Sequence, residues 1–231
     1  MNSYKFVFLI FASITLSSRS YIDYESPYHP VVGTSGMVVS QNNLSSDLGL
    51  EILNMGGNAV DAAVAVGFSL AVTLPRAGNL GGGGFMLVYL EENKEIFYID
   101  YRSKSPLNSN LENIFEIINN TGESFTTVPQ DFNYDLFDVL DEGYKASALP
   151  GTVSGLLEAH TRFGKLTLKE ILIPVIKQAR DGIVVSYDLH KAIESTPRLL
   201  KDPESKRIFF KNNKPIQENS ILKLPDLAKT I

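Results

Sequence analysis

The 231-residue sequence contains no cysteine, which removes disulfide bonds, thiol nucleophiles and cysteine-based metal sites from consideration. It leaves export open, because exported proteins also occur without cysteine. Basic residues are outnumbered, with 21 Lys and Arg against 26 Asp and Glu and a net charge of −5. A nucleic-acid partner would usually need a basic face, so this balance argues against one.

Long apolar runs are also missing, and no segment reaches the roughly 20 residues that a stable membrane span takes. Phe6–Leu16 is an apolar run of eleven residues behind Lys5, and small residues follow at Ser18-Arg19-Ser20. This order is typical of a cleaved leader. We therefore expect residues 1–20 to be a signal peptide and the protein to be periplasmic or extracellular, with an uncleaved signal anchor as the alternative.

The usual catalytic and metal-binding patterns are absent too. There is no Gly-x-Ser-x-Gly, and Ser147 and Thr152 flank a Pro-Gly turn without a visible base. His29, His160 and His190 do not pair with another histidine or acid at metal-ligand spacing, so they are interpreted as structural or surface residues. We expect no catalytic residue, no metal and no cofactor in this chain.

The most informative segment present is Gly56–Tyr89, GGNAVDAAVAVGFSLAVTLPRAGNLGGGGFMLVY. Asn58 is a suitable helix N-cap, and Asp61 stands three residues later, where a carboxylate favours the positive end of a helix. From Val60 to Leu74 the chain is apolar on nearly all sides and rich in alanine, which predicts a buried, closely packed helix.

Four consecutive glycines, Gly81–Gly84, come after that helix and before a strand. Glycine permits positive φ angles and close main-chain approach. Phosphate-binding loops place a lysine or a helix after their glycines, and neither follows here, which argues against nucleotide binding. The run is interpreted as a tightly packed turn, or as a turn that also lines a ligand cleft.

The rest of the chain shows alternating helix and strand patterns. We expect an extended lead-in over 21–35, one domain over 36–231, and mixed helical and irregular pieces over 106–144. Asn43 or Ser45 is predicted to cap the first helix. The predicted strands cover 37–40, 85–90 and 95–101, the last two as a hairpin, and the further helices cover 44–55, 153–162, 168–180, 186–193 and 225–231.

Arg102 is the candidate binding residue. It follows a predicted strand in a mostly apolar setting, in the sequence Asp100-Tyr101-Arg102. Guanidinium can hold a carboxylate through two parallel hydrogen bonds. A structural ion pair with Asp100 or a loop acid is the alternative. The basic residues between Lys201 and Lys214 are interpreted as a solvated face.

Four segments are similar, in order, to the large subunit of the γ-glutamyltransferases (glutathione hydrolases). They are residues 36–89, IDYRSKSP (99–106), the stretch 149–186 that begins LPGTVSG, and LPDLAKTI (224–231). The resemblance covers nearly all of the chain after the leader. Residues 36–231 are thereby identified as the N-terminal portion of such a subunit, truncated in this chain.

The resemblance implies an α+β fold, the αββα four-layer sandwich of N-terminal-nucleophile hydrolases, incomplete in this chain. It implies a self-processing precursor whose small subunit supplies a threonine nucleophile, which attacks glutathione and other γ-glutamyl compounds. By the same resemblance, Arg102 binds the α-carboxylate of the glutamyl group. That nucleophile would lie beyond Ile231, so the chain alone is expected to be inactive. The alternatives are a non-catalytic secreted remnant or binding module, and a cephalosporin-acylase-like amidohydrolase.

Overall fold

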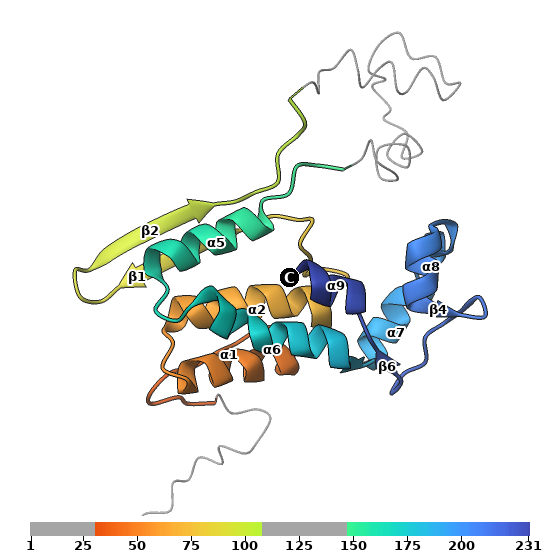
Figure 1. Cartoon of the computed structure of the whole chain (residues 1–231), viewed down its shortest axis with the longest axis horizontal. Coiled ribbons are helices and arrows are strands. Elements are labelled where there is room, and N and C mark those ends of the chain that lie inside the picture. The colour runs from red at the N-terminus through yellow and green to blue at the C-terminus, as the bar shows by residue number, and fades with distance from the viewer. Residues whose placement is uncertain (1–30, 108–146) are drawn as a thin grey trace, which may run out of the picture. The chain divides into compact units, whose positions relative to one another are not determined.

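The computed structural model describes residues 31–107 and 147–231 (Figure 1). The chain divides into two compact units, residues 1–37 and 38–231. In the first unit only 31–37 are described, and they form no helix or strand. The expected signal peptide over 1–20, most of the lead-in over 21–35 and most of the segment 106–144 lie outside the described residues.

Helix α2 (Ala59–Thr73) is the centre of the second unit, and it packs against α1 (Asn43–Asn54), α5 (Thr152–Phe163) and α6 (Leu168–Asp181) (Figure 1). Its side chains are buried on nearly every side, as the apolar pattern predicts. Small alanine and valine side chains allow three helices to approach it closely. The predicted N-cap Asn58 is confirmed, with a reciprocal capping box to Asp61.

A buried polar network ties three of these helices together. Ser45 Oγ of α1 lies 2.8 Å from Ser69 Oγ and 2.7 Å from Thr73 Oγ1 of α2. Ser69 Oγ donates in turn to Gln178 Oε1 of α6 at 2.7 Å. Because every member has a partner, these hydroxyl groups are buried without the penalty of an unmade hydrogen bond.

The predicted hairpin is confirmed as β1 (Phe85–Leu90) and β2 (Glu95–Asp100), which pair antiparallel with Phe85 opposite Asp100. Val88 and Ile99 are buried on the inner face. Phe97 reaches α5, where its ring centroid lies 4.9 Å from that of Phe163.

The outer face of the hairpin is apolar and uncovered by the described residues. Leu87 and Ile96 are 72% and 70% exposed. Phe85, Tyr89 and Tyr98 are also exposed on this face. A two-stranded sheet with one solvent-exposed apolar face is part of a layered fold rather than a complete one.

The C-terminal part consists of short elements around α6. The predicted helices there are confirmed as α7 (Tyr187–Glu194) and α9 (Pro225–Thr230). Sequence patterns missed the remaining elements, which are two to seven residues long: β3 (Ile183–Val184) paired with β6 (Ile221–Leu222), β4 (Phe210–Lys211) paired with β5 (Lys214–Pro215), η2 (Pro197–Lys201) and α8 (Pro203–Phe209).

Two local predictions are wrong. Residues 37–40 form no strand, since they pair with no strand of the described chain. Helix α1 is capped by Asn42 rather than by Asn43 or Ser45, because the Asn42 side chain accepts the Leu44 N–H while Ser45 is buried in the polar network. The mixture of helices and strands confirms the predicted α+β class.

Candidate functional site

Arg102 lies just beyond the end of β2, with an exposed side chain. The alternative of an ion pair with Asp100 is not realised. Asp100 Oδ1 accepts the main-chain N–H of Arg102 at 2.9 Å instead, which fixes the backbone and leaves the guanidinium available. Within the described residues the guanidinium makes no ion pair, and its Cζ atom lies 5.9 Å from the centroid of the Phe85 ring.

Arg102 lines a small hollow of about 210 Å³ between the end of β2 and the first turn of α5. Its rim carries charges of both signs, from Arg102, Lys104, Asp100 and Glu158. Main-chain hydrogen bonds between Lys104 and Leu149, at 2.8 and 3.0 Å, hold the two walls together. A hollow of this size accommodates one small polar group, such as a carboxylate, rather than a whole cofactor.

The glycine run is a packed turn that is hydrogen-bonded to both Tyr101 and the start of α5, the elements beside this hollow. The Gly82 carbonyl accepts N–H groups from Gly151 and Thr152 at the start of α5, at 2.8 and 3.1 Å. Gly84 pairs with Tyr101 through two main-chain hydrogen bonds of 3.0 and 3.3 Å. Two amides at the start of α5, those of Gly151 and Thr152, are therefore already occupied.

Tyr101 needs glycine on two sides. A Cβ on Gly155 would lie 2.1 Å from Cγ of the Tyr101 ring, and a Cβ on Gly84 would lie 2.7 Å from its Cε2. A Cβ on Gly151 would lie 1.9 Å from the Tyr101 carbonyl oxygen. Glycines from two separate segments thus make room for the strand end that carries Arg102.

The Tyr101 hydroxyl is a poor candidate for a general base. Burial raises its pKa above the ordinary value for tyrosine, so it remains protonated at neutral pH. It donates to the Phe85 carbonyl at 3.4 Å. Its role in the site is therefore structural.

Asp61 is fully buried, and the structure confirms its interpretation as a helix N-terminal acid. It accepts the Asn58 N–H at 2.9 Å, and it also accepts main-chain N–H groups of Lys165 at 3.0 Å and Leu166 at 3.2 Å. These bonds tie the loop between α5 and α6 to α2. The carboxylate is fully used in structure and is unavailable for chemistry.

The two described histidines are structural, as predicted, and His29 lies outside the described residues. His160 Nε2 bonds the Leu166 carbonyl at 2.9 Å and lies 3.8 Å from Asp61 Oδ1, while His190 Nδ1 bonds the Ile216 carbonyl at 2.8 Å. Across residues 31–107 and 147–231, no group of three or more acids and histidines is placed to hold a metal. In the same ranges no helix could cross a membrane.

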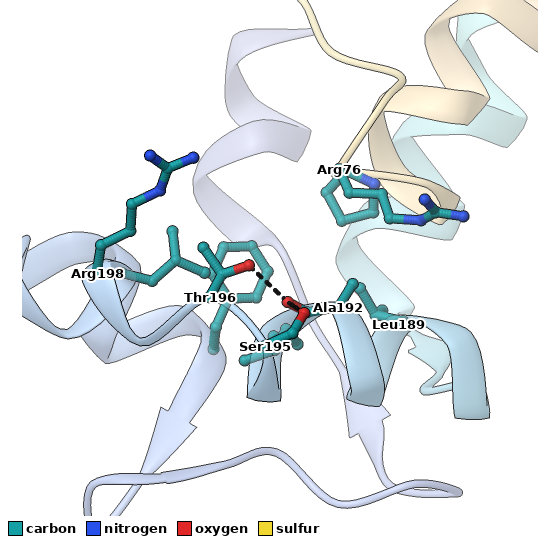
Figure 2. A pocket seen from close by; sticks show the side chains of 10 residues that line it. Arg76, Leu189, Ala192, Ser195, Thr196 and Arg198 are labelled. Carbon is teal, nitrogen blue, oxygen red and sulfur yellow. Dashed lines mark hydrogen bonds between the residues drawn. The ribbon is translucent and has the colours of Figure 1, made fainter. Parts of the chain in front are cut away.

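Sequence reasoning missed a second hollow, of about 430 Å³, between the loop after α2 and the end of α7 (Figure 2). Arg76 and Arg198 lie on opposite sides of it, with Ser195, Thr196 and Leu189 between them (Figure 2). No spacing in the sequence could have revealed it, because its walls are about 120 residues apart along the chain.

Most polar groups of this second hollow already have partners. Arg76 makes two hydrogen bonds to Asp188, at 3.0 and 3.2 Å. The hydroxyls of Ser195 and Thr196 both donate to the Ala192 carbonyl, at 3.1 and 2.7 Å. Neither hydroxyl has an adjacent base, so the hollow has no arrangement for nucleophilic catalysis.

The basic residues of the C-terminal part form a solvated face, as predicted. All of them are exposed, and Arg207 is paired with Glu204 at 2.7 Å and with Asp226 at 2.9 Å. The five residues are Lys201, Lys206, Arg207, Lys211 and Lys214.

Comparison with known families matches residues 45–231 to the family described as gamma-glutamyltranspeptidase. The glutathione hydrolase proenzyme of Pseudomonas sp. (strain A14) is 37% identical over 204 residues, covering 87% of this chain and 33% of the relative. The acylase ACY 1 proenzyme of Pseudomonas sp. (strain SE83) is 34% identical over 210 residues, covering 90% of this chain and 36% of the relative.

Among solved structures, the gamma-glutamyltranspeptidase of Helicobacter pylori is 35% identical, with a TM-score of 0.74. The match covers 87% of this chain and 54% of that chain. This chain therefore spans about a third of the length of the curated relatives it matches.

Proposed function

Because this chain belongs to the gamma-glutamyltranspeptidase family, we propose that it forms the carboxylate-binding side of an enzyme that cleaves γ-glutamyl amides. Glutathione and related γ-glutamyl compounds are the proposed substrates, with the glutamyl group passing to water or to an amino-acid or peptide acceptor. One observation carries the proposal: Arg102 presents an exposed guanidinium with no ion pair to any described residue.

The chemistry of Arg102 fits the α-carboxylate of a γ-glutamyl group. A guanidinium is always charged, and its planar fork matches a carboxylate through two parallel N–H···O bonds. Asp100 binds only the Arg102 main chain, so it holds the residue without neutralising the side chain through a direct ion pair. A substrate that carries an α-carboxylate in addition to its scissile amide is thereby selected over a simple amide.

The nucleophile and its base belong to another part of the proposed enzyme. In the two hollows, the Ser154 hydroxyl donates to the Gly151 carbonyl, and those of Ser195 and Thr196 donate to the Ala192 carbonyl. None is hydrogen-bonded to a base, so we assign binding and not bond cleavage to these hollows. We propose that a small subunit, cut from the same precursor, brings a threonine nucleophile to the Arg102 side. Neither this chain alone nor its Arg102 site would then hydrolyse a substrate.

We also propose export, on the strength of residues 1–20. They combine a positive start, an apolar run and small residues. The periplasm or the extracellular space is the proposed location, and detection of the mature N-terminus in that fraction is the test.

The main test uses this chain together with the remaining part of the family fold, supplied as the continuation of its gene or as a separate polypeptide. We expect release of glutamate from a γ-glutamyl anilide, and Arg102→Ala should lower kcat/KM about 10- to 100-fold. That range corresponds to the loss of a charge-assisted hydrogen-bonded pair.

Lys104→Ala is the matched control, because Lys104 is an exposed cation on the rim of the same hollow. It should change kcat/KM by less than about twofold, the scale of an exposed charge. Equal losses in the two variants would contradict a specific role for Arg102. The coding sequence beyond Ile231 and the neighbouring genes are searched for a small subunit with a threonine at a processing site. If none is found, the alternative of a non-catalytic secreted remnant or binding module is favoured.

An acylase with a different amide substrate is the second candidate, favoured by the 34% identity to an acylase proenzyme. The two are separated by a pair of anilides that differ only in the α-carboxylate, γ-glutamyl and 4-aminobutyryl. A γ-glutamyl-cleaving enzyme should prefer the first by about the same factor that Arg102→Ala costs, since both remove one partner of the same pair.

A further inference from the structure

We propose that Phe85, supported by Tyr98, is a positioning residue that holds the Arg102 guanidinium in its carboxylate-binding orientation. This inference rests on the proposed function and adds to it a residue that the α-carboxylate itself does not contact. It concerns orientation only, and Phe85 takes no part in bond making or breaking.

The register of the hairpin places the side chains of Tyr98, Phe85 and Arg102 in a row. Tyr98, Asp100 and Arg102 occupy alternate positions along β2 and its extension, so they belong to the same side of the chain. Phe85 lies opposite Asp100 in the register, and therefore between Tyr98 and Arg102. The Phe85 and Tyr98 rings are stacked, with centroids 5.9 Å apart and planes inclined by 18°.

The Arg102 guanidinium also lies over the Phe85 ring. Its Cζ atom lies 5.9 Å from the ring centroid, within the range at which a cation is attracted by an aromatic face. The main chain at both ends of this contact is fixed. Tyr101 donates its hydroxyl to the Phe85 carbonyl, and Asp100 accepts the Arg102 N–H.

An aromatic partner suits this position better than an acidic one. A long, exposed arginine side chain samples many rotamers, and binding must overcome that freedom. A carboxylate partner would restrict the rotamers but would occupy the same N–H donors that the substrate needs. The Phe85 ring accepts no conventional hydrogen bond, so it restricts the guanidinium while leaving its N–H groups and its charge for the ligand.

The proposal is tested with Phe85→Leu, which keeps an apolar side chain but removes the aromatic face, and with Phe85→Tyr as the conservative variant. Phe85 is 53% exposed in this chain, so neither change opens a cavity in the core that the described residues form. Tyr89→Leu is the matched control, because it removes another exposed aromatic ring from the same face of β1.

Two measurements are made. In NMR spectra of the full chain, the Arg102 Nε–Hε resonance should shift in Phe85→Leu, through loss of the ring current, and stay near its wild-type position in Phe85→Tyr and Tyr89→Leu. In the assembled enzyme, Phe85→Leu should raise KM about two- to fivefold with little change in kcat, the scale of an exposed cation–π contact expressed as uniform binding.

The outcomes separate the two proposals. If Arg102→Ala impairs catalysis but Phe85→Leu changes neither the resonance nor KM, the positioning role is overturned and the proposed function stands. If Phe85→Leu moves the resonance while Arg102→Ala leaves catalysis intact, Arg102 does not bind substrate, and both proposals are overturned. A rise in KM that Phe85→Tyr also shows would exclude the aromatic face as the cause.

Discussion

At the residue scale, Asp61 shows how much structure one side chain can organise. Its place at the third position of α2 could be predicted from Asn58 and the spacing of the capping box. Its bonds to Lys165 and Leu166, more than 100 residues away, could not. Local sequence specifies a cap, whereas the distant partner depends on how α5 and α6 pack against α2.

We predict that Asp61→Ala destabilises the chain by about 3 kcal/mol or more, because it leaves several buried N–H groups without an acceptor. Denaturant unfolding followed by circular dichroism is the measurement. Asp47→Ala is the control, since Asp47 is an exposed acid of the neighbouring helix α1, and it should change stability by less than about 0.5 kcal/mol. Similar losses of unfolding free energy in the two variants would show that the hydrogen bonds of Asp61 do not stabilise the fold.

Arg102 illustrates the limit of sequence reasoning at a single position. The strand end and the residue type point to a carboxylate ligand or to a structural ion pair, and the sequence does not choose between them. The structure removes the Asp100 ion pair, because that acid bonds the Arg102 main chain. That the guanidinium binds a substrate carboxylate stays a prediction.

At the element scale, the longer helices were predictable, apart from the cap of α1, and the short strand pairs were not. Helix α6 begins with Thr167 and Glu170 in a reciprocal capping box, a pattern contained within four residues. By contrast, β3 and β6 pair only two residues each across 36 intervening positions. Such short strands have no periodicity of their own, so only the packing around α6 reveals them.

The α6 capping box predicts a pH dependence of stability. The hydrogen bonds from the Thr167 hydroxyl and main-chain N–H hold the pKa of Glu170 below its ordinary value in the folded chain. A lowered folded-state pKa contributes stability that is present above the unfolded-state pKa. That stability is lost as the pH falls through the lowered folded-state value.

We therefore expect Glu170→Gln to flatten the acid side of the stability curve, measured by urea unfolding between about pH 3 and pH 7. Glu51→Gln is the control, because Glu51 is an exposed glutamate of α1 that takes no part in the N-cap of its helix. It should keep the wild-type slope. An unchanged slope in Glu170→Gln would count against the capping box as its source.

At the scale of the whole molecule, the αββα fold expected from the family resemblance is supported by gamma-glutamyltranspeptidase structures that match over most of this chain. The β1–β2 hairpin packs its inner face against α5, and this arrangement forms part of that sandwich. The apolar outer face agrees with a missing layer, since a sheet in a sandwich is covered on both sides.

We predict that this outer face makes the isolated chain prone to self-association. The double variant Leu87→Thr, Ile96→Thr makes this face more polar. Threonine is β-branched and suits a strand, and Phe85 and Tyr98 are left intact. Sedimentation velocity should show less association than wild type. Leu50→Gln on α1 replaces another exposed leucine, 48% accessible, and should leave association unchanged. If both variants associate equally, another surface is responsible.

By itself the sequence predicted the longer helices, the β1–β2 hairpin, the class and the candidate arginine. These depend on local spacing, capping and apolar periodicity, which a short window of residues carries. Only the tertiary structure decided which groups are already used: Asp100 by the Arg102 backbone, Gly82 by the start of α5, and Asp61 by a distant loop. It also brought Gly84 and Gly155 to opposite sides of Tyr101. Availability for binding depends on such long-range partners, and no local pattern encodes them.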